Sequence, residues 1–372
     1  MSDPVLEPGR SVRIDIVPET DTEIAVETLE TLETPPFASI EEAARALETL
    51  GAKPQHVRTF FRAYLGRAAW PDTSDERFPK RVREGLSAWR ARMEAVLAVR
   101  SRHPGADPES ERLLVTLADR QTVECVLLPR RGVCVSTQMG CAVGCVFCMT
   151  GKGGLVRQLS DLEIVAQAAT ARALRPHTKK VVFMGMGEPS HNLRNVLSAV
   201  RFLAEYGDFG HKDLVISTVG DERLFNELFA SRVRPALAVS LHTIDEAKRR
   251  TLLPRGTRMT VEALTDSAER YARFSGYPVQ YEWTLMAGVN DSFEEIDELA
   301  RLLGGQYAMV NFIPVNAVEG SPYRRPEPEH ARALVARLRA AGIVATLRDS
   351  AAQDVDGGCG QLRARVLKEE GK

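Results

Sequence analysis

Apolar residues along this chain form two alternating patterns. Six short runs rich in β-branched and other apolar residues predict strands at residues 132–137, 180–184, 213–218, 235–241, 279–285 and 308–315. Most of these runs precede a stretch with helical spacing, such as the one that Ser160-Asp-Leu-Glu163 opens with a capping-box spacing. Strands that alternate with helices predict parallel βαβ units, in an open doubly wound sheet or in a partly closed barrel.

The part of the chain before these strands has a different pattern. Helical spacing covers residues 39–50, 54–65 and 79–99, and Ser39 with Glu42 has the capping-box spacing. We therefore expect a small helical domain at residues 37–105, the βα region at 106–350 and a C-terminal segment at 351–372. Residues 1–36 are acidic and repetitive and end in two prolines, which predicts a disordered tail.

Polar residues stand where several predicted strands end. Glu188, Ser217, His242 and Asn316 lie at or just after the carboxyl ends of four of them. In parallel barrels this rim is where active sites are built. These side chains are therefore candidates for a common site.

Composition and charge narrow the class of protein. The chain has 372 residues, of which 44% are hydrophobic and 27% charged, so it can bury a large core. A formal net charge of −1 gives no overall attraction to nucleic acid, and an RNA partner would need a local basic patch. Candidate phosphate contacts are residues 157, 179–180, 248–250 and 324–325, although such runs are most often solvated surface. The chain shows no basic-then-apolar leader and no long apolar run, so we expect a soluble cytoplasmic protein without membrane contact.

The cysteines carry the strongest chemical signal. Three of the six, Cys141, Cys145 and Cys148, form a Cys-x3-Cys-x2-Cys array on a glycine-containing stretch. A structural zinc site needs four ligands, so zinc is possible but under-ligated here, and incidental thiols seldom cluster in this way. A cubane iron–sulfur cluster held by three thiolates leaves one iron open, and an open position on a metal lets it bind and activate substrate.

This array resembles the hallmark of the radical S-adenosylmethionine (radical SAM) enzymes. Further segments resemble one group of them, the RlmN/Cfr methyltransferases, which methylate adenosine in RNA. These segments occur in order along the chain, at residues 134–141, 185–189, 238–242, 312–316 and 356–362. The resemblance covers roughly residues 110 to 365.

The resemblance implies a fold and a set of cofactor contacts. The fold is an α/β partial (β/α)6 TIM-like barrel with a small helical N-terminal domain. The cofactors are a [4Fe-4S] cluster, bound by Cys141, Cys145 and Cys148, and S-adenosylmethionine, used twice per turnover as methyl donor and radical source. The residues that match the family's S-adenosylmethionine contacts are Gly187, Glu188, Ser217, Ser240, Leu241, His242 and Asn316.

The resemblance also implies roles for two outlying cysteines and one acid. Adenine C2 is electron-poor and needs a carbon radical rather than a simple methyl transfer. The residue matching the family's methyl carrier is Cys359, within the flexible Gly357-Gly-Cys-Gly360. Cys134 matches the cysteine that releases the methylated RNA by forming a disulfide with Cys359. Glu124 matches the acid assigned to proton transfer, whereas Cys125 has no matching role and is expected to be a small buried side chain.

Substrate and partners follow from the same resemblance. We expect methylation of adenosine C2 in 23S rRNA near the peptidyl-transferase centre, and also of the adenosine beside the anticodon in some tRNAs. An electron donor such as flavodoxin or ferredoxin is implied. Three alternatives stay open: a C8-methylating enzyme of the antibiotic-resistance type, a radical SAM enzyme acting on a non-RNA substrate, and a non-catalytic RNA-binding module that keeps a structural cluster.

Overall fold

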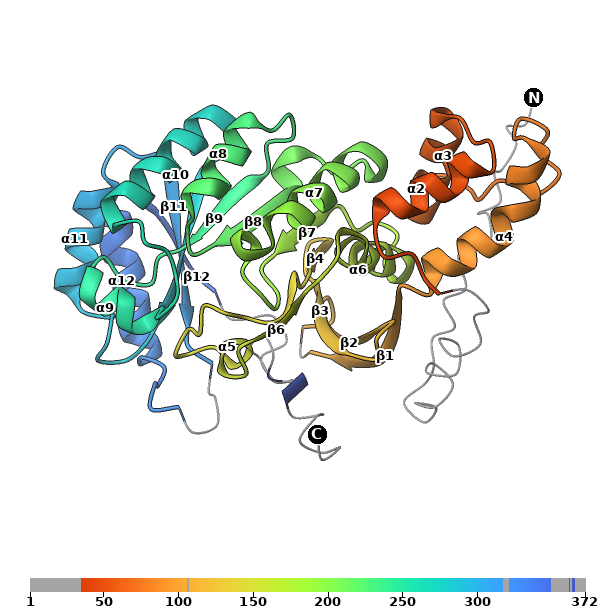
Figure 1. Ribbon diagram of the computed structural model, residues 1–372. Coiled ribbons are helices and arrows are strands. Elements are labelled where there is room, and N and C mark those ends of the chain that lie inside the picture. Colours follow the sequence, from red (N-terminus) through yellow and green to blue (C-terminus); the bar gives the residue numbers. More distant parts are fainter. Residues whose placement is uncertain (1–34, 106, 317–320, 349–360, 362, 365–372) are drawn as a thin grey trace, which may run out of the picture.

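The structure is a computed structural model that describes residues 35–105, 107–316, 321–348, 361 and 363–364. Nearly all of the predicted acidic tail, and most of the predicted C-terminal segment including Cys359, lie outside the described residues. The described chain contains a ten-stranded sheet in the order β1-β2-β3-β4-β7-β8-β9-β10-β11-β12 (Figure 1).

Seven neighbouring strands of this sheet are parallel. They are β4 (Gly132–Cys134), β7 (Lys180–Phe183), β8 (Leu214–Thr218), β9 (Ala236–Ser240), β10 (Val279–Leu285), β11 (Ala308–Pro314) and β12 (Val344–Leu347). The first six each lie within one of the six predicted strands, although β4 covers only the first half of the range 132–137, and β12 is an addition that the sequence pattern did not reveal. The sheet does not close on itself, so the predicted partial barrel is confirmed.

Helices cover one face of these strands. They are α6 (Asp161–Leu174), α7 (Leu193–Gly207), α8 (Glu222–Ala230), α9 (Glu246–Leu252), α10 (Val261–Ser275), α11 (Phe293–Leu303) and α12 (Pro328–Ala340), with short 3-10 turns η1 (Pro189–Asn192) and η2 (His211–Asp213). The predicted capping box opens α6, because Ser160 Oγ accepts from Glu163 N and the Glu163 carboxylate accepts from Ser160 N.

The two faces of the parallel strands bury different side chains. Alternate residues such as Phe183, Ile216 and Trp283 belong to the main core under the helices. The residues between them, such as Val182, Val215 and Ala238, form a separate small cluster on the concave inner face. Any polar residue in register with this second set therefore points into the interior of the barrel.

An antiparallel extension precedes the barrel. Strands β1 (Leu97–Pro104), β2 (Glu111–Leu117) and β3 (Thr122–Leu128) form a meander that joins β4. The helix predicted for residues 79–99 is therefore too long, and a strand occupies the end of the range assigned to the helical domain. The helix α4 (Lys80–Glu94) ends before β1 because Leu97–Val99 pair with β2, and this tertiary pairing overrides helix propensity.

The N-terminal helices α2 (Ile40–Thr49), α3 (Pro54–Tyr64) and α4 pack around Trp89, whose indole N–H donates to Ala43 O at 2.8 Å. They dock on α6 and α7, where Phe61 meets Phe202 edge-on with ring centroids 4.8 Å apart. Arg172 of α6 is buried at this junction and donates to the carbonyl oxygens of Leu65 (3.0 Å) and Gly207 (2.9 Å). The junction thus contains both apolar packing and hydrogen bonds to backbone.

Candidate functional site

Two glycines allow the loop after β7 to lie directly on the backbone that follows β4. A Cβ on Gly185 would stand 2.8 Å from the Val135 carbonyl carbon, and one on Gly187 would stand 2.6 Å from Gln138 Cβ. Gly187 also has a backbone φ of +103°, which residues other than glycine rarely adopt. Met186 O accepts from the backbone N–H groups of residues 137 and 138, at 2.8 and 3.1 Å. The site therefore has a fixed floor of closely packed backbone.

Glu188, which follows these glycines, is buried and precisely oriented by neighbouring donors. Its carboxylate accepts from Ser190 N at 3.0 Å, Thr218 Oγ1 at 2.6 Å and Val219 N at 3.0 Å. Its own N–H donates to Gln138 Oε1 at 2.7 Å. A carboxylate can accept about four hydrogen bonds, so one acceptor position stays available on the oxygen that Val219 contacts.

The cysteine array lies on the loop between β5 (Gln138–Gly140) and the short helix α5 (Met149–Lys152). The loop closes against β6 (Leu155–Gln158), where Cys141 N donates to Gly154 O at 2.9 Å. A Cβ on Gly140 would stand 1.9 Å from that same oxygen, so only glycine fits there. Backbone bonds from Val146 N to Leu252 O (3.1 Å) and from Arg255 N to Val143 O (3.0 Å) attach the loop to the end of α9.

The surroundings of Cys141 and Cys145 disfavour free thiolates. Burial raises the pKa of Cys141 to about 12 and that of Cys145 well above its usual value, and the charges of the other thiols and Glu188 act in the same direction. Such thiols become thiolates when they bind a cationic metal. In the part of the chain that the structure describes, no three His, Cys, Asp or Glu side chains form a group that could hold a metal ion. A cubane binds each of its thiolates to a different iron, so its ligands need not converge on one point.

Two buried hydroxyls beside Glu188 also bear on what the site can bind. Within the described residues, Thr137 Oγ1 and Ser190 Oγ have no hydrogen-bond partner. Thr137 lies where the cysteine-bearing hairpin leaves β4, and Ser190 is the residue whose N–H binds Glu188. Buried polar groups are nearly always hydrogen-bonded, so unpartnered ones indicate a place where a bound group supplies the partner.

The remaining predicted S-adenosylmethionine contacts lie along the carboxyl ends of neighbouring strands. Ser217 is the penultimate residue of β8, and Ser240 is the last residue of β9. Leu241 N continues the strand pairing by donating to Glu282 O at 3.1 Å. Asn316 comes two residues after β11. The structure thus brings Glu188, Ser217, Ser240 and Asn316 to one edge of the sheet.

His242 has an unusual backbone and a defined tautomer. Its φ is +63°, in the left-handed region that is uncommon for residues other than glycine. Nδ1 accepts from Thr284 N at 3.0 Å, so the neutral ring carries its proton on Nε2. Burial, and then the charge of Arg249, lower the pKa of His242 to about 3. The ring is therefore a neutral hydrogen-bond donor at physiological pH.

Two residues that sequence reasoning missed hold this edge together. Asn290 Nδ2 donates to His242 O (2.6 Å) and Thr284 O (2.7 Å), and its Oδ1 accepts from Met286 N (2.8 Å). Arg249 is buried and donates to the carbonyl oxygens of residues 219 (2.8 Å), 240 (3.0 Å) and 241 (3.3 Å). Neither residue belongs to a recognisable motif, so nothing in a single sequence separates them from surface residues.

Glu124 is not at a solvent-facing strand position but in a buried ion pair. Arg112 Nη1 donates to its carboxylate at 2.6 Å, and both side chains are 2% exposed. Cys134 pairs in register with Val126, two residues from Glu124, so the two side chains lie on the same face. Burial raises the pKa of Cys134 to about 12. Cys125 lies in the main core at 1% exposure, as predicted.

The C-terminal residues that the structure describes contact the same acid. Arg363 N donates to Glu124 Oε1 at 2.9 Å, and Arg363 Nε donates to Thr122 O at 2.7 Å. The residue four positions after Cys359 is therefore attached to the strand beside β4.

Several basic residues considered as phosphate contacts are already engaged. Arg157 binds Glu163 at 2.8 Å and Asp119 at 2.7 Å, and Lys248 binds Glu295 at 2.6 Å. Arg249 is buried, so its assignment to a solvated basic run is wrong. The run of basic residues at 248–250 did not reveal that the Arg249 side chain points inward from α9.

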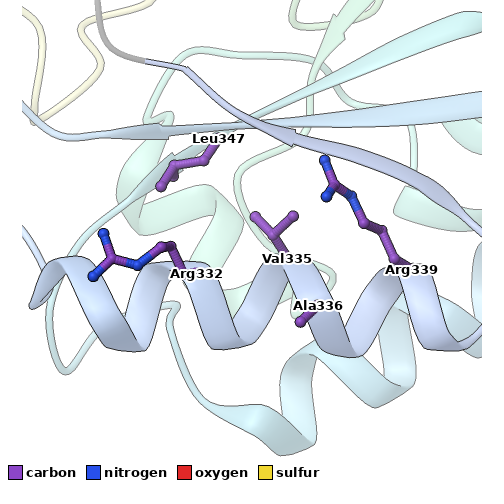
Figure 2. A pocket seen from close by; sticks show the side chains of 5 residues that line it. All are labelled: Arg332, Val335, Ala336, Arg339 and Leu347. Atoms are coloured by element: carbon purple, nitrogen blue, oxygen red, sulfur yellow. The ribbon is translucent and has the colours of Figure 1, made fainter.

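A surface pocket lies away from these residues, between α12 and β12 (Figure 2). It is lined by Arg332, Val335, Ala336, Arg339 and Leu347. Arg339 Nε donates to Ala345 O at 2.8 Å. The lining contains none of the predicted site residues.

Among the described residues, no helix combines the length and apolar character that crossing a membrane requires.

Comparisons with known proteins agree with the geometry. The sequence profile of the Radical SAM superfamily matches residues 135–303. A probable RNA methyltransferase of Azoarcus sp. (strain BH72) is 55% identical over 332 residues, which cover 88% of this chain and 95% of that protein. A second, from Ectopseudomonas mendocina (strain ymp), is 52% identical over 331 residues, with coverage of 88% and 95%. The crystal structure of a radical SAM methyltransferase from Sphaerobacter thermophilus is similar with a TM-score of 0.78 and 36% identity, covering 89% of this chain and 100% of that one.

Proposed function

This chain belongs to the radical SAM methyltransferase family, and on that premise we propose that it methylates C2 of an adenosine in 23S rRNA. Its relatives from Azoarcus and Ectopseudomonas are described as probable RNA methyltransferases, which supports an RNA substrate. The choice of adenosine C2 rests on the RlmN/Cfr-like segments quoted above. The adenosine beside the anticodon of some tRNAs is a second candidate substrate.

The family uses a [4Fe-4S] cluster and S-adenosylmethionine, which when bound supply a methyl group and a 5′-deoxyadenosyl radical. Cys141, Cys145 and Cys148 would hold the cluster. Reduction of the cluster would come from a donor protein such as flavodoxin or ferredoxin. An rRNA substrate and such a donor imply that the protein acts in the cytoplasm.

The polar residues at the strand ends would hold S-adenosylmethionine. The acceptor position that remains on Glu188 suits an ammonium group, because charge-assisted hydrogen bonds to a buried carboxylate are strong. The Nε2–H of His242 offers one donor. The other proposed contacts are Gly187, Ser217, Ser240, Leu241 and Asn316.

Two cysteines would share the methyl transfer, Cys359 as carrier and Cys134 in the release step. Cys359 would accept the methyl group on sulfur, and one hydrogen atom of that group would pass to the 5′-deoxyadenosyl radical. The methyl carbon would then bond to adenine C2, which links protein and RNA, while the adduct gives up one electron to the oxidised cluster and the C2 proton to a base. The Cys134 thiolate then attacks the Cys359 sulfur, so that an S–S bond forms as the S–C bond breaks and its electron pair stays with the carbon. A dithiol must afterwards reduce the Cys134–Cys359 disulfide by exchange.

Glu124 would accept the proton that C2 loses and return one to the new methyl carbon. The Arg112 guanidinium holds this carboxylate in place, because its Nη1 donates to Glu124 Oε2 at 2.6 Å. Glu124 and Cys134 lie on one face of adjacent strands, which suits two groups acting on one adduct.

The observation that carries this proposal is the contact between Arg363 and Glu124. Residues four positions apart in a chain are separated by at most about 14 Å. The contact attaches residue 363, four positions after the proposed carrier, to the strand that bears Glu124, and this chain length is compatible with the proposed exchange between Cys134 and Cys359.

The test uses anaerobically reconstituted protein with S-adenosylmethionine, a reductant and 23S rRNA. Nucleoside mass spectrometry against 2-methyladenosine and 8-methyladenosine standards identifies the product. We expect 2-methyladenosine with the wild type, none with Cys359→Ala, and covalently trapped RNA with Cys134→Ala. Cys125→Ala is the matched control, since it removes a buried thiol from the neighbouring strand and should leave the product unchanged. Release of 5′-deoxyadenosine without any methylated nucleoside would contradict the proposed substrate.

A further inference from the structure

A row of polar side chains crosses the inner face of the barrel at one level. Ser240 of β9 is in register with Glu282 of β10, Glu282 with Asn311 of β11, and Asn311 with Thr346 of β12. Register partners on parallel strands point to the same side of the sheet. Ala238 lies two residues before Ser240 on β9 and belongs to the inner cluster, so both side chains point to the same face. The four side chains of the row therefore face the interior of the barrel.

The hydrogen bonds in this row run in one direction. Thr346 Oγ1 donates to Asn311 Oδ1 at 2.7 Å, and Asn311 Nδ2 donates to Glu282 Oε1 at 2.8 Å. The hydroxyl of Thr346 requires the Asn311 amide oxygen to face it, which leaves the amide N–H group for Glu282. The row therefore ends on a carboxylate, and the next side chain along it is Ser240.

Glu282 is buried at 4% exposure, and this costs free energy that its visible contacts only partly offset. Within the described residues, Asn311 is the only hydrogen-bond donor to the side chain, and it occupies one of the two oxygens. Burial raises the pKa of Glu282 to about 7, although Arg348 and Lys180 lower it. A buried carboxylate oxygen directed into the barrel interior is suited to a ligand that brings hydrogen-bond donors.

We propose that Glu282 binds the ribose hydroxyls of S-adenosylmethionine. This inference rests on the proposed function, because it takes Ser240, the adjacent residue in the row, as a contact of that cofactor. A carboxylate is a strong acceptor for a ribose hydroxyl, as in the acidic residue that binds the ribose 2′-OH in dinucleotide-binding folds. Asn311 and Thr346 are positioning residues, because they fix the orientation of the carboxylate without reaching the ligand.

The charges around Glu282 favour a neutral donor over a cation. The positive charges of Lys180 and Arg348 already act on this carboxylate from β7 and from the end of β12. A cationic ligand group would be repelled by them, and the ammonium of the cofactor has its own acceptor in Glu188. A pair of uncharged hydroxyls meets the remaining acceptor capacity without adding charge.

The test compares binding of three unreactive probes to the reconstituted protein by isothermal titration calorimetry. The probes are S-adenosylhomocysteine and its 2′-deoxy and 3′-deoxy forms. We expect the wild type to bind S-adenosylhomocysteine about tenfold or more tighter than at least one deoxy form, because hydrogen bonds to a charged acceptor are among the stronger ones. In Glu282→Gln this ratio should fall to about 2, since the acceptor becomes a neutral amide.

Glu111→Gln is the matched control. It removes the charge of another buried strand carboxylate, on β2, which is paired with Arg102 of β1 at 2.6 Å, and it should keep the wild-type ratio. A wild-type ratio near 1, or an unchanged ratio in Glu282→Gln, overturns the assignment of Glu282 and leaves the proposed function standing. Failure of the wild type to bind S-adenosylhomocysteine at all overturns both. The wild-type comparison needs no variant, so a folding defect in Glu282→Gln does not prevent a decision.

Discussion

Replacing Asn290 by alanine tests whether one buried amide maintains the strained edge of the site. The side chain is fully buried and serves three backbone groups, namely His242 O, Thr284 O and Met286 N. In Asn290→Ala all three lose their side-chain partner at once. The same change frees His242 to leave its left-handed conformation at φ +63°.

The magnitude follows from these opposing effects. A buried backbone group left without a partner costs about 1–3 kcal/mol, so three groups cost about 3–6 kcal/mol when water reaches some of them. Relaxation of His242 out of its left-handed conformation would offset roughly 1–2 kcal/mol of this loss in the free energy of unfolding. The net loss is about 3 kcal/mol, which corresponds to a decrease in Tm of roughly 6–12 °C for a domain of this size.

The assay is thermal unfolding followed by circular dichroism, at fixed protein concentration under reducing conditions. Asn195→Ala is the control, because Asn195 is a partly buried amide whose Nδ2 donates to Leu159 O and to the side chain of Asn192, both at 2.9 Å. The Leu159 oxygen keeps a second donor, Asn192 Nδ2 at 2.7 Å, so the control should lose less than about 1 kcal/mol. If Asn290→Ala lowers Tm no more than the control does, the three hydrogen bonds of Asn290 do not stabilise this edge as argued.

Three further predictions concern other parts of the molecule. Gly187→Ala should weaken S-adenosylhomocysteine binding at least tenfold in calorimetry, because its Cβ would meet Gln138 at 2.6 Å, whereas Gly153→Ala, with open space around it, should bind normally. The pKa of Asp208 is lowered to about 2, first by its hydrogen bond to an arginine. The ionised carboxylate therefore stabilises the fold fully above about pH 4, and this contribution is lost as the pH falls toward 2. In urea unfolding, Asp208→Asn should match the wild type at pH 2 but be less stable than it at pH 7. The pKa of Glu282 is raised from 4.5 to about 7. The free energy of unfolding of the wild type should therefore fall by up to roughly 3 kcal/mol relative to that of Glu282→Gln as the pH rises from 4.5 through 7. Urea midpoints of the two proteins that stay parallel across this range would contradict this prediction.

The sequence was most informative where local pattern and fold agree. The six parallel strands were predictable because each is a short run rich in apolar and β-branched residues, and the cysteine array was predictable because its spacing needs no tertiary information. The glycines at positions 185 and 187 were recognised as a motif, and the structure gives the reason, which is close contact with backbone 135–138.

The remaining features depend on contacts that a single sequence does not encode locally. Strand β1 exists because β2 offers it an edge, and its own residues also suit the end of a helix. Arg249 and Asn290 look like surface residues of a helix and a loop until the strands place carbonyl oxygens around them. Glu282 reads as an ordinary member of an apolar run, and only the register with Ser240 and Asn311 reveals that it faces inward.

The junction between the helical domain and the barrel has a consequence for how the two parts can evolve. Arg172 recognises the carbonyl oxygens of Leu65 and Gly207, and every amino acid carries that oxygen. These hydrogen bonds therefore depend on the path of the backbone and not on the side chains of residues 65 and 207, whereas the Phe209 ring, 4.0 Å from the guanidinium, is a side-chain contact. Leu65 is buried, and a Cβ on Gly207 would stand 2.7 Å from Phe209, so packing restricts both positions, but the hydrogen bonds to residue 172 add no side-chain requirement. Covariation of residue 172 with these two positions should therefore be weak. Chimaeras that exchange the helical domain between relatives should keep the attachment as long as they keep the arginine.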